Sequence, residues 1–183
     1  EDLALTARVD VKPVKGLLVG GSVFTGNAGQ GATEPGGATI DARTTIFDVH
    51  AEYRARGIQA RALWARTSID DVELINTAQG LAGNASVGER QYGWYGEVGY
   101  DVLAPVESRQ SVVPFARYER LNTQDRVPSG FAVNLANDMT ITTLGVVWKP
   151  ILSIAVKADW NKVENVAETG VDRISVGALT KDV

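Results

Sequence analysis

Apolar and polar residues alternate at a period of two through most of this sequence. In the segment 152–160 every second residue is apolar, from Leu152 to Trp160, and the residues between them are mostly polar. Similar stripes recur along the chain, and many of them end in Trp or Tyr. A soluble β-sandwich can also alternate, but aromatic-ended stripes of about ten residues are typical of barrel strands that cross a membrane. The pattern therefore predicts an all-β chain that forms a transmembrane antiparallel up-and-down β-barrel.

The composition agrees with a barrel and excludes several other classes. With 183 residues the chain suits one domain, and its mean hydropathy is −0.06. No apolar stretch approaches the roughly 18 residues of a membrane helix. The net charge of −4 argues against nucleic-acid binding, and the absence of cysteine excludes disulfide scaffolds and thiolate metal sites. Glu1-Asp2-Leu3 does not resemble an export signal, so we expect that the gene begins upstream of residue 1.

Short and long connections alternate between the expected strands. We expect nine strands, near residues 3–13, 16–25, 44–56, 57–67, 90–103, 111–122, 138–149, 151–162 and 171–179. The long connections, expected near 26–43, 68–89 and 122–137, are interleaved with short turns such as Ala55-Arg56-Gly57. This order is typical of barrels with periplasmic turns and extracellular loops. Pro114 lies inside an expected strand, where it suggests a bulge or a break.

The second long connection has a helical pattern. Ser68 followed by Asp71 resembles a capping box, and apolar residues recur every three positions until Gly80. We expect a short helix there. It either packs on the rim of the barrel or folds inward to narrow the channel, and the sequence favours neither arrangement.

Aromatic residues are expected at both ends of the apolar stripes. Tyr53, Tyr100 and Trp148 lie beside short turns, whereas Trp64, Tyr92, Trp94, Tyr118 and Trp160 lie beside long loops. Trp and Tyr favour the interface between lipid and water. These residues therefore predict two aromatic girdles.

The opposite face of the expected strands is charged. Its candidate pore-lining residues are Arg8, Asp10, Asp48, His50, Glu52, Arg54, Arg61, Glu97, Arg117, Glu119, Lys157 and Asp159. A dry core could hold so many charges only if all of them were paired. A watery lumen, or one lined by ion-pair ladders, accommodates them. Because basic and acidic residues are interleaved, we expect at most a weak preference for anions.

One row of charged residues could carry chemistry. Asp48, His50 and Glu52 stand at alternate positions, a pattern that could bind a divalent metal or transfer protons. The alternative, which we favour, is a lumen row paired with Arg61 on the next strand. His50 is the only histidine, and the chain has no Gly-x-Ser-x-Gly elbow. We therefore expect no enzymatic activity, no catalytic residues, no metal and no cofactor.

A calcium site in the second long connection is also conceivable. Asp70, Asp71 and Glu73 could hold the ion, but their spacing lacks an EF-hand pattern. Solvation of the surface is the interpretation we favour.

The last 75 or so residues resemble the C-terminal half of Gram-negative outer-membrane porins, especially the phosphate-selective porin O/P-like group. The resemblance lies in VPFARYER at 113–120, TTLGVVWKP at 142–150, VKADW at 156–160 and DRISVG at 172–177. It implies a larger, usually trimeric barrel of about sixteen strands that passes small hydrophilic solutes or anions through the bacterial outer membrane. Outer-membrane lipid and lipopolysaccharide would surround such a barrel. The chain departs from the family by ending in Val183 rather than an aromatic residue, and by being about half as long.

Nine strands would place the two ends of the chain on opposite sides of the membrane. Single-chain bacterial barrels have an even number of strands, so this chain is either part of a barrel or has one strand more or fewer. Two rival classes remain. One is a small filled barrel that acts as an anchor or adhesin, and the other is a soluble lipocalin-like binder, which would need an apolar interior.

The alternation predicts opposite outcomes for two neighbouring residues. Val156 lies in the middle of the apolar stripe 152–160, so Val156→Arg should cost about 2–4 kcal/mol of unfolding free energy in a bilayer. Lys157→Ala should cost much less. Equal losses in reversible unfolding from lipid vesicles would show that the faces are assigned wrongly.

Overall fold

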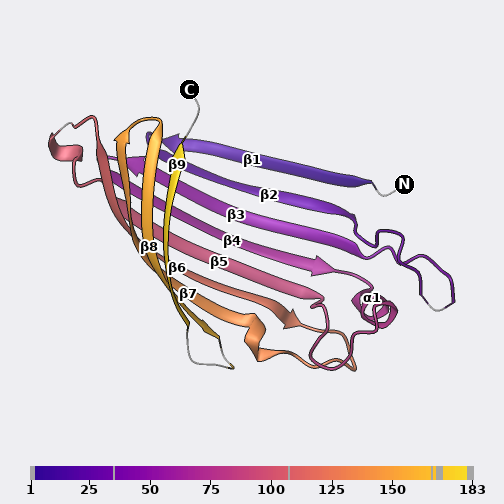
Figure 1. Ribbon diagram of the computed structural model, residues 1–183. Helices are drawn as coiled ribbons and strands as arrows, with labels where there is room; N and C mark the ends of the chain where they lie inside the picture. Colours follow the sequence, from indigo (N-terminus) through magenta and orange to yellow (C-terminus); the bar gives the residue numbers. More distant parts are fainter. Residues whose placement is uncertain (1–2, 35, 107, 166, 168–170, 181–183) are drawn as a thin grey trace.

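The chain forms one antiparallel sheet in the computed structural model, which describes residues 3–34, 36–106, 108–165, 167 and 171–180 (Figure 1). Nine strands pair in the order of the sequence. The strands are β1 (Ala4–Val14), β2 (Leu17–Asn27), β3 (Arg43–Ala55), β4 (Ile58–Ile69), β5 (Arg90–Tyr100), β6 (Ser111–Arg126), β7 (Asp138–Ile151), β8 (Ile154–Asn165) and β9 (Val171–Thr180). The helical elements are α1 (Val72–Ala78) and two 3₁₀ turns, η1 (Ala104–Val106) and η2 (Leu135–Asn137). The expected nine strands are thus confirmed, with small shifts at their ends.

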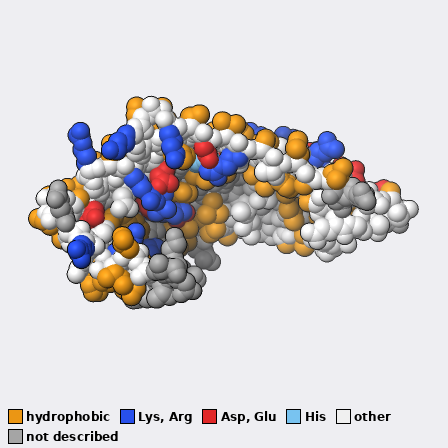
Figure 2. Space-filling model, turned by 90° about the horizontal axis from the view of Figure 1, so that it is seen from above, with side chains coloured by type: hydrophobic (Ala, Val, Ile, Leu, Met, Phe, Trp, Pro, Cys, Tyr) orange, Lys and Arg blue, Asp and Glu red, His pale blue; other side chains and the backbone are white. Residues whose placement is uncertain are grey.

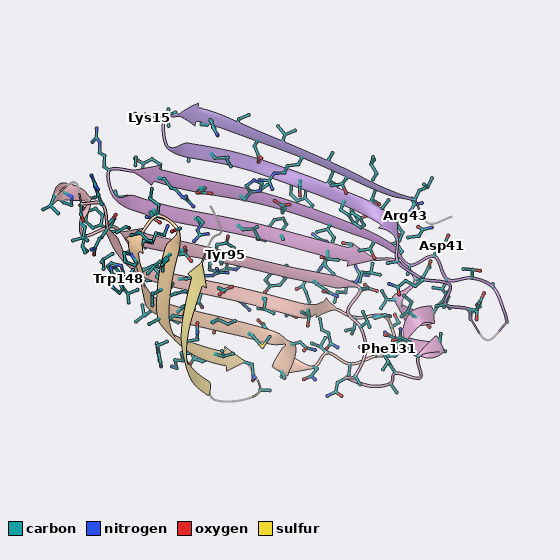
Figure 3. All side chains as sticks on the ribbon, turned by 45° about the horizontal axis from the view of Figure 1, so that its top comes forward. Lys15, Asp41, Arg43, Tyr95, Phe131 and Trp148 are labelled. Atoms are coloured by element: carbon teal, nitrogen blue, oxygen red, sulfur yellow. The ribbon has the colours of Figure 1, made fainter. Side chains whose placement is uncertain are left out.

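The short and long connections also alternate as expected. Figure 3 places Lys15 and Trp148 at one end of the sheet and Arg43 and Phe131 at the other. The β3–β4 hairpin turns through Arg56 and Gly57, whose φ angles are 52° and 81°. Two successive positive φ angles are typical of a type I′ turn, whose twist matches that of the strands it joins.

The largest shift is in β6, which continues to Arg126 rather than ending near residue 122. The third long connection therefore begins at residue 127. Residues 122–126 are polar at every position, so the apolar alternation that marks the rest of the strand disappears there. Pairing with β5 nevertheless continues, because Arg90 lies opposite Arg126 after a register shift.

Pro114 does not interrupt β6, contrary to the prediction of a bulge or break. The register with β7 runs through Pro114 without a shift. The register with β5 ends at Phe115, so Pro114 lies one residue beyond that ladder. A proline at the end of one ladder need not supply a hydrogen bond to it.

The helix expected in the second long connection is present, but its cap is not the predicted one. Asp71 is the N-cap residue of α1 and makes no capping hydrogen bond through its side chain. The helix lies beyond the end of β4 (Figure 1). Its Asn76 is buried, and the side-chain amide accepts from the N–H of Val87 at 2.9 Å and donates to the Val87 carbonyl at 3.3 Å.

A second buried amide joins the long connections to each other. The Gln124 side chain donates to the carbonyl of Ser86 and accepts from the N–H of Asn134 at 2.6 Å. Gln124 thereby ties β6 to the segments on either side of it. Among the described residues, none of the helices is long and apolar enough to cross a membrane.

The sheet is a single layer with very little buried core. Its accessible surface is 11915 Å², well above the roughly 8,500 Å² expected for a compact monomer of this mass. Only four described aliphatic residues are buried, namely Ile40, Ala42, Val72 and Val113. Figure 2 shows hydrophobic side chains on the surface beside mixed basic and acidic ones.

The sheet is curved, and its two edge strands remain unpaired with each other. In Figure 1, β8 and β9 stand at a steep angle to β1–β5. Within the described part of the chain, β1 pairs only with β2 and β9 pairs only with β8. The architecture shown is therefore an open antiparallel meander.

Strand register confirms that the predicted apolar stripes share one face. Val49 lies opposite Trp64, and Trp64 lies opposite Trp94, so the stripes of β3, β4 and β5 are on the same side. The same parity continues through the remaining pairs. We call this side the apolar face. It is open to its surroundings, since Val9 is 69% exposed and Val98 56% exposed.

Asp101 organises the connection between β5 and β6. Its Oδ1 accepts hydrogen bonds from the N–H groups of Leu103 and Val112, both at 3.1 Å. Burial alone would raise the pKa of Asp101. The hydrogen bonds from the Ser111 hydroxyl and the two N–H groups, together with the Lys149 charge, outweigh burial and hold this pKa below its ordinary value.

The lowered pKa of Asp101 makes this connection sensitive to acid. The carboxylate stabilises the fold above its unfolded-state pKa of about 4, and this contribution disappears as the pH falls through the lower folded-state pKa. Asp101→Asn should therefore be less stable than the parent at pH 7 and should lose less stability on acidification. Unfolding curves recorded from neutral to acidic pH measure this. Parallel curves for parent and variant would contradict it.

Candidate functional site

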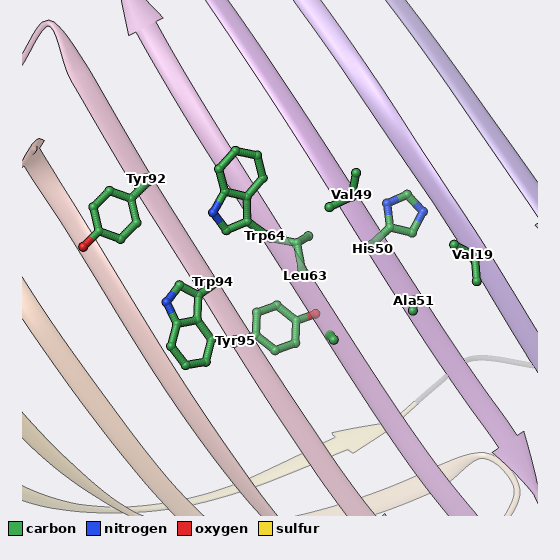
Figure 4. Close-up of a pocket in the computed structure, with 10 residues that line it drawn as sticks. Val19, Val49, His50, Ala51, Leu63, Trp64, Tyr92, Trp94 and Tyr95 are labelled. Atoms are coloured by element: carbon green, nitrogen blue, oxygen red, sulfur yellow. The ribbon is translucent and has the colours of Figure 1, made fainter.

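The twelve predicted pore-lining residues all lie on the face opposite the apolar face. Strand register shows this directly: Glu52 lies opposite Arg61, Arg61 opposite Glu97, and Glu97 opposite Arg117. Figure 4 shows the sheet from the Trp64 and Trp94 side, with the yellow C-terminal strand passing behind it. The sheet therefore curls toward the side that bears these charges, which we call the charged face.

His50 is the centre of the first polar cluster on the charged face. Its Nδ1 lies 2.8 Å from Oδ1 of Asp48, and its Nε2 lies 2.8 Å from Oδ1 of Asp10. Nη2 of Arg8 is 3.0 Å from the same Nε2. With both nitrogens protonated, the ring donates to both carboxylates. With Nε2 unprotonated, this atom accepts from Arg8 instead.

Gly20 makes room for this cluster. It lies between Asp10 and His50 in the sheet register. A Cβ at this position would lie 2.6 Å from His50 Nε2 and closer still to the Asp10 carboxylate. The hydroxyl of Ser22, which lies opposite Asp48, donates to the Asp48 carboxylate. Small residues on β2 thus let side chains of β1 and β3 meet across it.

The second cluster is a row of alternating charge across β4, β5 and β6. Nη2 of Arg61 donates to Glu97 at 2.7 Å, and Nη1 of Arg117 lies 3.8 Å from the same carboxylate. Arg117 also donates to Glu119 at 2.7 Å. Its guanidinium lies 3.9 Å from the centre of the Tyr95 ring, so the ring face supports the charge.

The third cluster lies on β7 and β8. Lys157 pairs with Asp159 at 3.0 Å, and the amide of Asn161 donates to Asp159 at 2.7 Å. Thr143 donates to Asn161 at 2.6 Å. The row formed by Arg61, Glu97 and Arg117 continues in register through Thr143 and Asn161. A line of polar side chains therefore crosses five strands, from β4 to β8.

The predicted pairing of the Asp48, His50 and Glu52 row with Arg61 is wrong. Arg61 lies opposite Glu52, but its guanidinium binds Glu97 on the other side. Glu52 instead pairs with Arg54 at 2.5 Å. The three residues of the row do not converge on one point, and the described residues contain no group of three ligands suited to a metal ion.

Every Arg and Lys among the twelve predicted pore-lining residues has an acidic neighbour. The pairs are Arg8–Asp10, Arg54–Glu52, Arg61–Glu97, Arg117–Glu119 and Lys157–Asp159. The field along the charged face therefore alternates in sign over short distances. Such a surface is wettable and has no strong preference for one sign of ion.

Sequence reasoning missed two aromatic residues of the charged face. Tyr95 lies under Arg117, and the ring of Phe115 lies 5.1 Å from Nζ of Lys157. Phe115 also covers Gly145, where a Cβ would meet the ring at 2.6 Å. Tyr95 is two residues from Glu97 on β5, and Phe115 is two residues from Arg117 on β6. The alternation of the sequence could therefore have placed both rings on the charged face.

Comparisons with known proteins do not assign the chain to a family. No protein-family model matches the chain, so the resemblance to phosphate-selective porins gains no support from that source. An uncharacterized protein of Aquifex aeolicus (strain VF5) is 28% identical over 165 residues, which cover 87% of this chain but only 37% of that protein. LpxR from Salmonella typhimurium has a similar structure at a TM-score of 0.35 and 11% identity, over 97% of this chain and 88% of LpxR.

The close packing around Gly20 predicts that a side chain at this position lowers the stability of the fold. Gly20→Ala should reduce the unfolding free energy by about 1–3 kcal/mol, because the new methyl group displaces Asp10 or His50. The imidazole resonances of His50 should shift at the same time. Gly96→Ala is the control, since a Cβ there meets nothing within 4 Å. Equal effects of the two changes on stability would refute the proposed role of Gly20.

Proposed function

We propose that this chain forms part of the wall of a barrel in a bacterial outer membrane, which passes small hydrophilic solutes and ions by passive diffusion. The observation that supports it is the division of one sheet between an exposed apolar face and a charged face. Each face suits a different medium, lipid on one side and water on the other. The channel needs no cofactor or catalytic turnover in this proposal.

The apolar face has the dimensions of a lipid-facing band. On β5 it extends from Tyr92 to Tyr100, about 26 Å along the strand at the usual rise per residue. This length is of the order of the roughly 25 Å band of outer-membrane barrels. On β4 the band ends after Trp64, and the next residue on that side is Arg66. The aromatic residues at both ends suit the two lipid–water interfaces.

The charged face supports conduction rather than storage of an apolar ligand. Its ion pairs are partly exposed, with the Arg61 side chain 50% and the Lys157 side chain 48% accessible. Partly exposed pairs of alternating sign hold water without repelling either sign of ion. We therefore propose weak selectivity, with at most a slight preference for anions.

The open edges support a barrel larger than this chain. An exposed edge strand offers unpaired backbone groups, and lipid cannot satisfy them. The chain spans 37% of the length of its Aquifex relative, so further strands are available in a protein of that length. We propose that such strands join β1 to β9. A trimer of such barrels, in contact with lipopolysaccharide, is the assembly suggested by the porin resemblance.

A filled barrel that acts as an anchor or adhesin is the alternative. It is favoured by the lateral pairing on the charged face, because paired charges also suit a dry or nearly dry interior. Planar-bilayer recordings of the complete protein distinguish the two functions. Stepwise ohmic openings support the channel, and an impermeable bilayer supports the anchor.

The channel proposal predicts a shift in ion preference. Neutralising Arg54, Arg61 and Arg117 to Gln should move the reversal potential toward cation preference, because their acidic partners remain. The shift should be larger in dilute salt, where the Debye length is about 30 Å at 0.01 M against about 10 Å at 0.1 M. Arg66→Gln, on the apolar side, is the control and should leave the reversal potential unchanged. An unchanged potential in the triple variant would show that these arginines do not line the path.

A further inference from the structure

Basic residues follow the aromatic residues of the apolar face at the long-connection end of the sheet. Four aromatic residues there have a basic residue two positions further toward the long connections, in the pairs Trp64 and Arg66, Tyr92 and Arg90, Tyr118 and Arg120, and Trp160 and Lys162. Alternate residues of a strand point to the same face and lie about 7 Å apart. The four basic side chains therefore lie on the apolar face, just beyond the rings. We call these four residues the basic border.

The short-turn end of the sheet has a different border. The residues two positions beyond its aromatic residues are Ala55 after Tyr53, Val102 after Tyr100 and Pro150 after Trp148. None of these three residues is charged. Basic side chains at a membrane surface attract anionic lipids. In a bilayer, the apolar face would therefore select anionic lipid in the leaflet at its long-connection end.

Arg66 is the member of the basic border with the most hydrogen-bond donors to spare. It is exposed, and none of the ion pairs among the described residues involves it. The other members each have an acidic partner, in the pairs Arg90–Asp125, Arg120–Asp138 and Lys162–Glu164. A guanidinium carries five N–H groups, so Arg90 and Arg120 can still donate to a further acceptor.

An apolar hollow lies next to the basic border, on the side of the rings. It has a volume of about 680 Å³, and its walls come from β2 to β5 (Figure 4). Trp64, Tyr92 and Trp94 line it at the side nearer the long connections. Ala62, which lies opposite Ala51, belongs to its floor of small residues. The hollow offers room for an acyl chain against the aromatic rings.

A polar hollow continues the apolar one toward the long connections. It has a volume of about 440 Å³, and Arg66 and Arg90 line it together with Asp70 and Asp71, which follow the end of β4. From Ala62 through Arg66 to Asp70, the chain thus changes from apolar to basic to acidic. A ligand that matches this order has acyl chains, then phosphate, then groups that donate hydrogen bonds.

We propose that this part of the apolar face binds the lipid A portion of lipopolysaccharide, which is a phosphorylated sugar with several acyl chains. Arg66 and Arg90 bind a phosphate, for which the guanidinium fork is well shaped. An acyl chain lies in the apolar hollow, and sugar hydroxyls donate to Asp70 and Asp71. The inference rests on the proposed function, because the apolar face must meet lipid and the long connections must lie at the outer leaflet.

The complete protein in nanodiscs tests the phosphate contact. The discs contain equal amounts of bisphosphorylated lipid A and phosphatidylglycerol, and a chelator removes divalent cations that could bridge phosphate to carboxylate. Native mass spectrometry counts the lipids that remain bound after release from the discs. Lipid A should be retained in preference to phosphatidylglycerol. In parallel discs, lipid A without its phosphates should be retained about tenfold less, the loss expected for charge-assisted hydrogen bonds.

Arginine variants test the basic border. Arg66→Gln should lower the retention of lipid A about tenfold, for the same reason. Arg109→Gln, which changes an exposed arginine at the other end of the sheet, should retain lipid A like the parent. Asp138→Asn should raise the retention, because it releases Arg120 from its carboxylate partner. A substitution that only loosened the fold would not produce this gain.

A pair of alanine variants tests the apolar hollow. Ala62→Leu should fill the hollow and lower the retention of lipid A with or without its phosphates. Ala60→Leu is the control, because Ala60 lies on the same face two residues nearer the short turns and does not line the hollow. Equal effects of the two changes would overturn the assignment of an acyl chain to the hollow.

The outcomes distinguish this inference from the function on which it rests. Equal retention of lipid A with and without phosphate, equal retention by the parent and Arg66→Gln, or a preference for phosphatidylglycerol would overturn the lipid A site while leaving the barrel intact. Unchanged retention in Asp138→Asn would overturn the part assigned to Arg120. Failure of the parent to enter nanodiscs at all would instead overturn the membrane location. Far-ultraviolet circular dichroism confirms that each variant keeps its strands.

Discussion

An apolar sheet face that no other part of the described chain covers is the constraint on which the rest of this structure depends. A single antiparallel layer leaves both faces exposed, and here one of them consists of aliphatic and aromatic side chains over several neighbouring strands. In water such a surface would drive association, because it far exceeds the patches that soluble monomers expose. A surrounding apolar phase removes the difficulty. The polar residues that begin immediately beyond Trp64, Tyr118 and Trp160 mark where that phase would end.

The charged side chains of the opposite face are stabilised by ion pairs with their neighbours on the same face. The described ion pairs of this face join residues of the same strand, of adjacent strands or, for Asp10 and His50, of two strands on either side of β2. Neighbours within the sheet therefore satisfy these charges. Glycine and serine on β2 are part of this arrangement, because larger residues there would separate Asp10 from His50. Neither face needs a second protein layer, which explains how a chain with only four buried aliphatic residues in its described part keeps a defined fold.

The sequence was sufficient for the strands and their faces, but not for contacts that depend on register or on loops. Successive residues of a strand point to opposite faces of the sheet. The faces on which Trp64 and Arg61 lie could therefore be predicted from the neighbouring residues alone. The partner of Arg61 could not, because both Glu52 and Glu97 lie opposite it and only the side-chain conformation decides. The end of β6 was predicted four residues too early, because residues 122–126 are polar on both faces of the strand. Gln124 was missed for the same reason, since nothing distinguishes a buried glutamine from an exposed one in a polar segment.

The order of the strands has a consequence for how such a sheet is built and altered. Each strand pairs only with its neighbours in the sequence, so the register of a hairpin depends on its own turn and not on distant parts of the chain. Loop-closure entropy is then small at every step, and hairpins can form one after another from either end. Duplication or loss of a whole hairpin would widen or narrow the sheet while leaving the remaining pairs unchanged. A sheet of this kind can change its width by simple genetic events.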